Sequence, residues 1–385
     1  MAFDCYCAIC GVGFSGMHIE AQSETAMERR RRWVAKRTRA LQLGKDFNQV
    51  SREEGNDEPP IRSYDPRIVG TEKIEWLYKA HCLAMNEDSK GKEKLVCQQA
   101  RTTFAENNDS PISRRAFISG PGYYADMGEL VVKAGPDSPR PFHRDVYACY
   151  SHSTEEASGP VLPFHQCCFE ILTRTLTGSD NTQDLNLDVL YHIMNTLSNG
   201  SSSALQLSYG DDYCATHPTN IPNLDVFIEN SMTTHAGLKL PSEEVTAGDR
   251  NPTNPFGRLP FEIVERICLY LPGESLKALT QASLSIQLLT QDNFFWKRFM
   301  QWDMPWFWEL QTSQTRKMAP EDLNYKRLYL WLDNMTMPRY GMDDLSVIGV
   351  ANRRRIWGVC EQLAPQYHKG LNQTSGELPR WGSVC

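Results

Sequence analysis

Two pairs of cysteine and histidine residues are the side chains of this sequence best placed to do chemistry. Cys7 and Cys10 are separated by two residues and precede Gly11, and His165 and Cys168 repeat this spacing far downstream. Two ligands at this spacing can bind one tetrahedral metal ion from a single turn, and the glycine lets the backbone close beneath the sulfurs. Cys7, Cys10, His165 and Cys168 are therefore candidate ligands of a structural zinc ion.

Other interpretations of these cysteines stay open. The first ten residues lack the basic start and apolar run of a secretory signal, so we expect a cytoplasmic or nuclear protein, in which cysteines stay reduced or bind metals. The twelve cysteines would then be free and buried, metal-binding or redox-active. Cys5 and Cys167 are neighbouring residues that could take the place of the predicted ligands.

The sequence contains none of the motifs that position a catalytic group. It lacks Gly-x-Ser-x-Gly, a phosphate-binding loop, His-Glu-x-x-His and paired carboxylates. The segment from Gly11 to Gly16 matches Gly-x-Gly-x-x-Gly, but a basic run occupies the position where a dinucleotide site needs an acidic residue, so we interpret these glycines as turns of the cysteine knuckle. We expect no enzymatic activity. The alternative, a cysteine-dependent hydrolase within residues 60–240, would need a cysteine beside a histidine in a cleft.

Charge and hydropathy argue against two further classes of protein. The formal net charge is −7, whereas nucleic-acid binding needs clustered positive charge, and no apolar stretch reaches the roughly 18 residues of a membrane-spanning helix. We therefore expect no membrane and no specific nucleic acid among the partners. One basic run lies at 29–39, in a helix predicted near 22–43. We interpret it as a solvated helix face, with nuclear targeting or an acidic partner as alternatives.

Residues 1–240 predict an α+β domain. Short apolar runs separated by Gly, Pro and Asp indicate strands at 115–124, 130–132 and 205–209. Apolar residues at helical spacing predict one helix over about 166–177, ended by Gly178, and another after about residue 182. The polar segment 241–257, with Pro and Gly near its ends, is the predicted linker.

Three short helices are predicted over residues 258–300. Pro260 can occupy the start of the first helix, where a missing N–H costs nothing, and Pro272-Gly273 ends it. A second helix follows, and Asp292 caps the third. Three helices of this length cannot bury all their apolar side chains against one another, so some must contact a neighbouring domain or another protein.

This segment resembles an F-box. Leu259-Pro260-Phe261-Glu262-Ile263, then Ile267, then Tyr270-Leu271, is similar to the consensus of Leu-Pro-x-Glu-Ile, a later Ile, and Tyr-Leu, and Asp292 to Trp296 resembles its acidic and aromatic-Trp end. The chain departs from the family at Ser283-Leu284-Ser285, where a Cys/Ser-Arg and an aromatic residue are usual. The resemblance implies apolar docking on a Skp-type adaptor as a helix in a groove. The residues that it implies for this contact are Leu259, Pro260, Ile263, Ile267, Leu271, Leu276 and Trp296.

The resemblance also implies a role for the whole chain. A Skp-type adaptor joins an F-box to cullin and RING subunits while the rest of the chain holds an unknown protein substrate. The chain would thus be the substrate-recognition adaptor of an SCF-type ubiquitin ligase, which acts by proximity. The alternative is a non-catalytic interaction scaffold, which burial of Leu259, Ile263 and Ile267 against residues 301–385 would favour.

Residues 301–385 predict an aromatic-rich, mainly helical C-terminal region. Its most aromatic part, Trp302 to Trp308, is interpreted as core, with a substrate pocket as the alternative.

Two resemblances bear on the cysteine pairs. A knuckle Cys-x-x-Cys with a helix-borne His-x-x-Cys is similar to the first zinc site of LIM-type treble-clef fingers, split here by a long insertion. Many fungal F-box proteins carry Cys-x-x-Cys-Gly, Pro-Phe-His-x-x-Cys and Asn-Arg-Arg-Arg-Ile-Trp. This chain has the three motifs at 7–11, 163–168 and 352–357. The likeness implies a split zinc knuckle, with zinc as the only cofactor.

Overall fold

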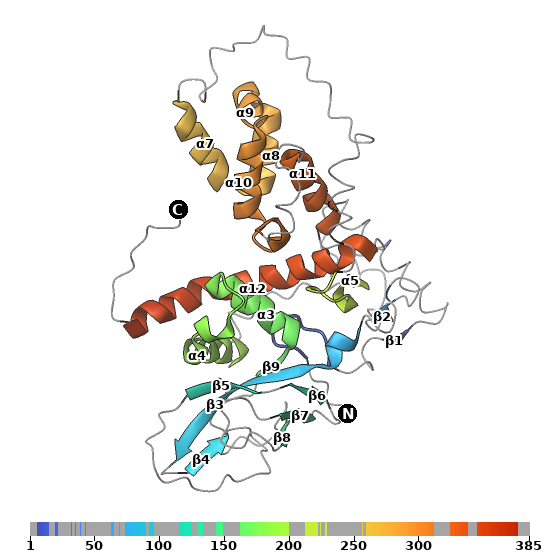
Figure 1. The fold of residues 1–385 in the computed structure, drawn as a ribbon, viewed down its shortest axis with the longest axis vertical. Coiled ribbons are helices and arrows are strands. Elements are labelled where there is room, and N and C mark those ends of the chain that lie inside the picture. The colour runs from blue at the N-terminus through green and yellow to red at the C-terminus, as the bar shows by residue number, and fades with distance from the viewer. Residues whose placement is uncertain are drawn as a thin grey trace. The chain divides into compact units, whose positions relative to one another are not determined.

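The chain forms two compact units in the computed structural model. Unit 1 comprises residues 1–220 and 338–385, and unit 2 comprises residues 221–337 (Figure 1). The structure describes residues 6–14, 20–21, 63–64, 74–89, 92–95, 115–119, 121–124, 129–133, 144–148, 162–199, 212–221, 259–311, 324–337 and 345–375, and single positions between them.

Unit 1 contains an antiparallel sheet whose longest strand is β3 (Ala80–Ser89). Four strands pair with β3: β4 (Lys92–Leu95), β5 (Arg115–Ile118), β6 (Gly122–Tyr124) and β9 (Leu162–His165). Beyond β6 the sheet continues with β7 (Glu129–Lys133) and β8 (Arg144–Ala148). Two short strands, β1 (Glu20–Ala21) and β2 (Ser63–Tyr64), form a separate parallel pair. The register between β3 and β9 places Ala80 beside His165 and so fixes one candidate ligand on the sheet.

Among the described residues of unit 1, four α-helices accompany this sheet: α3 (Gln166–Thr177), α4 (Leu187–Asn199), α5 (Asp212–Ala215) and α12 (Leu345–Ser375). Two short 3-10 helices, η3 (Glu75–Tyr78) and η4 (Thr182–Asp184), lie before β3 and α4. The long helix α12 packs along α3 and also contacts α4 and α5 (Figure 1). The apolar stripe of α3 is buried, and Gly178 ends the helix with a left-handed φ of 74°.

Unit 2 is helical among its described residues. Its elements are α7 (Phe261–Tyr270), α8 (Gly273–Ala282), α9 (Leu284–Leu289), α10 (Asn293–Asp303), η6 (Trp308–Gln311) and α11 (Tyr325–Thr336). Its core is aromatic: Trp296 and Phe299 of α10 pack on Tyr329 of α11 with ring centroids 5.1 and 5.2 Å apart. Asp292 caps α10, because its side chain accepts a hydrogen bond from the N–H of Phe294.

The α+β class predicted for the chain is confirmed, but several details differ. The predicted strand over 115–124 is two strands, and the run 130–132 lies within β7. The second predicted helix of the F-box segment is also two, α8 and α9, because Ser283 between them has extended backbone with φ −135°. Residues 259–303 therefore contain four helices instead of the three predicted.

The division into units differs from the predicted domain boundaries. A single C-terminal region was predicted over 301–385, whereas α11 belongs to unit 2 and α12 to unit 1. The physical reason is that α12 packs against α3, α4 and α5 of unit 1 and buries its apolar side chains. Within the aromatic run, Trp306 and Phe307 are buried, as the core interpretation expects, and Trp302 is exposed.

Some predictions fall on residues outside the described part of the chain. These are the strand at 205–209, Cys5, most of the linker 241–257 and most of the helix near 22–43, of which Arg32, Ala35 and Arg39 are helical and exposed. Within the described part of the chain, no helix combines the length and apolar character needed to span a bilayer.

Candidate functional site

The first cysteine pair lies on a tight knuckle. The N–H of Gly11 donates to the carbonyl of Cys7, and the N–H of Cys7 donates to the carbonyl of Val12, both at 2.9 Å. Gly11 has φ 67°, a left-handed conformation that a residue with a Cβ adopts at a cost. The predicted interpretation of this glycine as a knuckle turn is thus confirmed. The N–H of Ala8 donates to the carbonyl of Pro163 at 2.8 Å, which fixes the knuckle on β9.

The second pair lies where β9 meets α3. His165 is the last residue of β9 and the residue that precedes α3, and Cys168 lies in the first turn of that helix. The imidazole of His165 is fully buried and packs against Phe14 and Trp76, with ring centroids 4.4 and 4.9 Å away. Its orientation is therefore set by aromatic packing, and its Nδ1 atom faces the cysteines.

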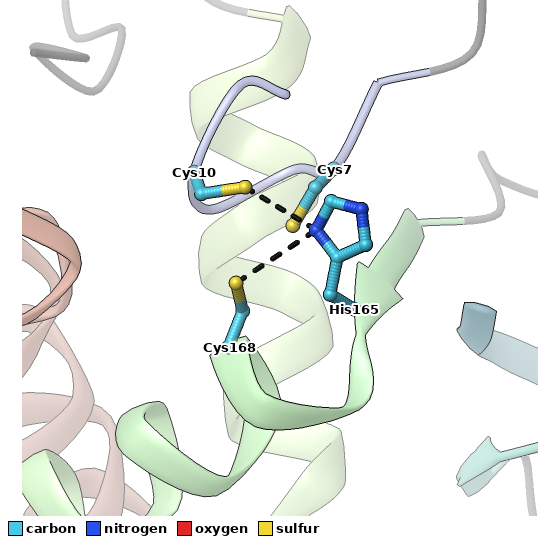
Figure 2. A group of neighbouring side chains, drawn as sticks. All are labelled: Cys7, Cys10, His165 and Cys168. Atoms are coloured by element: carbon cyan, nitrogen blue, oxygen red, sulfur yellow. Dashed lines mark hydrogen bonds between the residues drawn. The ribbon is translucent and has the colours of Figure 1, made fainter. Parts of the chain in front are cut away.

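The structure brings all four predicted ligands together (Figure 2). The Nδ1 atom of His165 lies 3.3 Å from the sulfur of Cys10 and 3.9 Å from the sulfur of Cys168. The four ligand atoms of Cys7, Cys10, His165 and Cys168 all lie within 4.8 Å of one another, and all four residues are buried. Donor atoms around one tetrahedral ion at bond lengths of about 2.0–2.3 Å are separated by similar distances. The cluster could therefore hold one metal ion.

The thiols of the cluster differ in acidity. Burial raises the pKa of Cys7, but hydrogen bonds from Cys10 and Cys168 and from backbone N–H groups outweigh burial and hold this pKa well below its usual value. Burial and its contacts with neighbouring thiols raise the pKa of Cys168 well above the usual range. Cys7 is thus favoured over Cys168 as a thiolate, and a metal ion would displace the proton of Cys168.

The alternative register at Cys167 is not supported by the geometry. Cys167 is buried next to Cys168, but its sulfur is not among the four clustered ligand atoms. Burial raises the pKa of its thiol, as expected for a structural cysteine of the core.

A third segment, from α12, completes the surroundings of the knuckle. The guanidinium of Arg355 donates to the carbonyl of Cys10 at 2.8 Å, across 345 residues of sequence. Arg355 belongs to the Asn-Arg-Arg-Arg-Ile-Trp motif at 352–357, to which the sequence alone assigned no role. Residue types alone did not reveal its contact with the knuckle.

The predicted adaptor-binding residues fall into two groups. Leu259, Pro260, Ile263 and Ile267 are exposed, and Leu271 is half-buried. Leu276 and Trp296 have exposed fractions of 0% and 1%. The prediction for these two is corrected: they form the core of unit 2, because Trp296 donates its indole N–H to the carbonyl of Thr290 at 2.6 Å and packs on Tyr329. They can influence docking only through the fold.

Helix α7 has buried and exposed apolar side chains: Val264 and Cys268 are buried, whereas Phe261, Ile263, Ile267 and Tyr270 are exposed. Apolar side chains that recur every four residues, Ile263 and Ile267, thus face solvent instead of the core. We name the exposed set Leu259, Phe261, Ile263, Ile267 and Tyr270 the α7 face.

Helix α10 borders the α7 face. Trp302 packs edge-on against Tyr270 with ring centroids 5.6 Å apart, and Arg298 forms an ion pair with Glu265 at 2.9 Å. Phe294 and Trp302 are themselves exposed and enlarge the apolar area.

Comparison with known proteins adds no relative: no family model, no curated protein and no solved structure matches this chain.

Proposed function

We propose that this chain is the substrate-recognition adaptor of an SCF-type ubiquitin ligase and that its α7 face binds a Skp-type adaptor. The observation that carries the proposal is the exposure of three aliphatic side chains of the F-box-like motif. The exposed fractions are 42% for Leu259, 46% for Ile263 and 37% for Ile267. Burying one such side chain fully is worth about 1.5–3 kcal/mol, so a cluster left in water favours a partner.

The same exposure argues against the alternative of an internal scaffold. Within unit 2 that alternative requires Leu259, Ile263 and Ile267 to pack against residues 301–337, whereas each keeps more than a third of its surface exposed beside the described residues of that unit. The aromatic side chains beside them, Phe261 and Tyr270, are 59% and 70% exposed. Aromatic groups of this kind anchor protein interfaces.

Unit 1 has the character of a binding module in this proposal. Cys10 and His165 lie within hydrogen-bond distance, but both are fully buried, so no substrate reaches the thiol. A nucleophilic role would need an open cleft. In this proposal the part of the chain outside the α7 face holds the substrate, and the Skp-type adaptor supplies the connection to cullin and RING subunits.

The metal of the buried cluster is zinc in this proposal. Three sulfurs and one imidazole nitrogen are donors typical of structural zinc sites, and four protein ligands leave no open position for catalysis. The ion would tie the knuckle to β9 and α3, across more than 150 intervening residues.

Binding to a purified Skp-type adaptor tests the proposal. We expect the full-length chain to co-purify with it, and Ile267→Asp to abolish binding, because the substitution places an unpaired charge in an apolar contact. Leu288→Asp is the matched control, since Leu288 is 47% exposed on α9 and outside the motif. A folded wild-type chain that does not bind the adaptor, or equal binding by Ile267→Asp, would contradict the proposal.

A further inference from the structure

Helix α12 carries polar side chains that are buried beside the metal cluster. Asn352, Arg353 and Arg355 have exposed fractions of 0%, 0% and 3%. Burying a guanidinium is costly unless its N–H groups are hydrogen-bonded, so the position of each group is set by its partners. Cys360, one to two turns further along α12, is also buried. Burial is the largest cause of the raised pKa of the Cys360 thiol, and the nearby Cys7 and Cys10 raise it further. This part of α12 thus lies against the cluster.

The partners of Arg355 connect the knuckle to α12. One terminal nitrogen donates to the carbonyl of Cys10 at 2.8 Å. The Nε atom and the other terminal nitrogen donate to the side-chain oxygen of Asn352 at 3.0 and 2.9 Å. The guanidinium of Arg355 is therefore fixed between Asn352 and Cys10, and Cys10 is one of the candidate metal ligands.

Asn352 extends this network to the end of α5 and the residues that follow it. Its amide nitrogen donates to the carbonyl of Thr216 at 2.7 Å and to the carbonyl of Cys214 at 3.3 Å. Arg353 reaches the same segment, because its Nε donates to the carbonyl of Pro218 at 2.8 Å. One chain of hydrogen bonds thus joins the knuckle, α12 and residues 214–218.

The charge of Arg355 complements a loaded site. Three thiolates and a neutral imidazole around Zn²⁺ leave one net negative charge in a buried environment. A guanidinium on the carbonyl of Cys10 places a positive charge next to that anion, where the low dielectric makes the attraction strong. It also fixes the Cys10–Gly11 peptide, whose orientation the knuckle needs.

We propose that Arg355 is a positioning residue of the metal centre, and that through Arg355 and Asn352 metal binding is coupled to the docking of α12. The inference rests on the zinc site of the proposed function. It adds a residue outside the ligand set, and it assigns the Asn-Arg-Arg-Arg-Ile-Trp motif to the metal centre.

Zinc affinity measured by competition with a chromophoric chelator tests the role of Arg355 in the full-length protein. The wild-type chain is expected to bind about one equivalent. Arg355→Met should lower the affinity about 10–100-fold, the loss typical of groups that orient metal ligands. Arg355→Lys keeps the positive charge, so its zinc affinity should lie between those of the wild type and Arg355→Met. Arg354→Met removes the neighbouring, half-buried guanidinium and should change the affinity less than about threefold.

A loss of general stability is distinguished from a loss of positioning by two further measurements. Gly370→Ala disturbs α12 where it contacts Val189, away from Cys10, and should leave zinc affinity unchanged. The visible spectrum of bound Co²⁺ should change in Arg355→Lys, because the ligand field follows the knuckle geometry. If Arg355→Met does not fold, the spectrum and affinity of Arg355→Lys decide the question.

The coupling is tested by hydrogen exchange of the wild-type protein with and without a chelator. Removing zinc should speed exchange in residues 347–360 and 212–218 as well as in the knuckle, and leave α10 unchanged. If both Arg355 variants bind zinc as tightly as the wild type, or if removing zinc leaves hydrogen exchange in α12 unchanged, this inference is wrong. Either result would leave the proposed zinc site intact. A folded wild-type chain that binds no zinc would instead contradict the proposed metal site.

Discussion

Two histidines of unit 1 lie close to Trp76 and serve different purposes. His165 turns its Nδ1 atom to the cysteines. The ring of His217 packs against the ring of Trp76, with ring centroids 5.8 Å apart. The Nδ1 atom of His217 accepts hydrogen bonds from the backbone N–H groups of Thr219 and Asn220, at 3.2 and 3.0 Å. Only a nitrogen without a proton can accept these bonds, so the folded state requires the Nδ1 atom of His217 to be unprotonated.

This requirement predicts a pH dependence of stability. Burial, followed by the positive charges of Lys79 and Arg353, lowers the pKa of His217 from 6.5 to about 4. The unfolded chain therefore takes up a proton first as the pH falls, and the stability present above about 6.5 is lost progressively down to about 4. His217→Asn keeps an acceptor and removes the titration, so it should flatten this part of the profile.

Chemical denaturation of both proteins between pH 4 and pH 7 measures the effect. We expect the wild type to lose about 1–2 kcal/mol more than His217→Asn over this range, after allowance for partial solvent screening. Any acid release of a metal is common to both proteins and cancels in the difference. If the two proteins lose stability equally between pH 7 and pH 4, His217 does not control the loss of stability at acid pH.

At the residue scale, the metal ligands could be predicted from the sequence and their surroundings could not. The two intervening residues within each pair are a local signal. Thiol and imidazole groups are donors suited to one tetrahedral ion, so Cys7, Cys10, His165 and Cys168 could be predicted to form one site. Arg355 gave no comparable signal, because a run of arginines in a sequence is more typical of a solvated helix face. Its burial depends on packing between segments that are far apart in the chain.

At the scale of elements, helix ends in unit 2 were predictable because their signals are local. Pro260 precedes α7, and Asp292 caps α10 as expected. The break at Ser283 was missed, although serine before a helix is a known start signal. The spacing of apolar residues in α7 was informative too: Val264 and Cys268 are buried, whereas Ile263 and Ile267 of the motif are exposed.

Packing of α12 on α4 depends on a glycine. A Cβ atom added at Gly370 would lie 2.6 Å from the Cγ1 atom of Val189, whereas a Cβ atom at Gly358 of the same helix meets nothing within 4 Å. Valine is β-branched and stiff at χ1, so it cannot move away without cost. Substitution of Gly358 therefore measures the intrinsic helix preference alone, whereas substitution of Gly370 also measures the close contact between α12 and α4.

Alanine substitutions at the two glycines should therefore have opposite effects. Gly358→Ala should stabilise unit 1 by about 0.5–1 kcal/mol, because alanine favours a helix interior. Gly370→Ala should destabilise it by about 1–2 kcal/mol, because overpacking outweighs the same gain. Urea denaturation followed by tryptophan fluorescence measures both, and stabilisation by Gly370→Ala would show that α12 and α4 are not in close contact there.

At the scale of the whole molecule, the chain leaves unit 1 near residue 220 and returns to it at residue 338. Unit 2 is thus an insertion between the sheet of unit 1 and its longest helix. The sequence predicted a linker before the F-box segment but gave no sign of this return. Amphipathic spacing shows that a helix has a buried face without identifying the element that covers it.

A chain that ends at Met337 should separate the two units. It retains unit 2 complete and removes α12, whose largest buried apolar side chains are Val347, Ile348, Val350, Ile356, Trp357, Val359, Leu363 and Tyr367. At about 1.5 kcal/mol or more for each, or about 12 kcal/mol or more in all, their loss is as large as the 5–15 kcal/mol by which domains are stable. We expect unit 1 to unfold and metal binding to be lost, because Arg355 and the cover of the cluster are removed together.

The helices of unit 2 should survive this truncation, because their aromatic core lies within residues 221–337. Peptide-resolved hydrogen exchange should show protection in α10 and α11 close to that of the full chain and fast exchange in α3. Adaptor binding through the α7 face should persist, with Ile267→Asp in the truncated chain as the control. Retention of protected α3 and of a bound metal would show that unit 1 does not need α12 to fold.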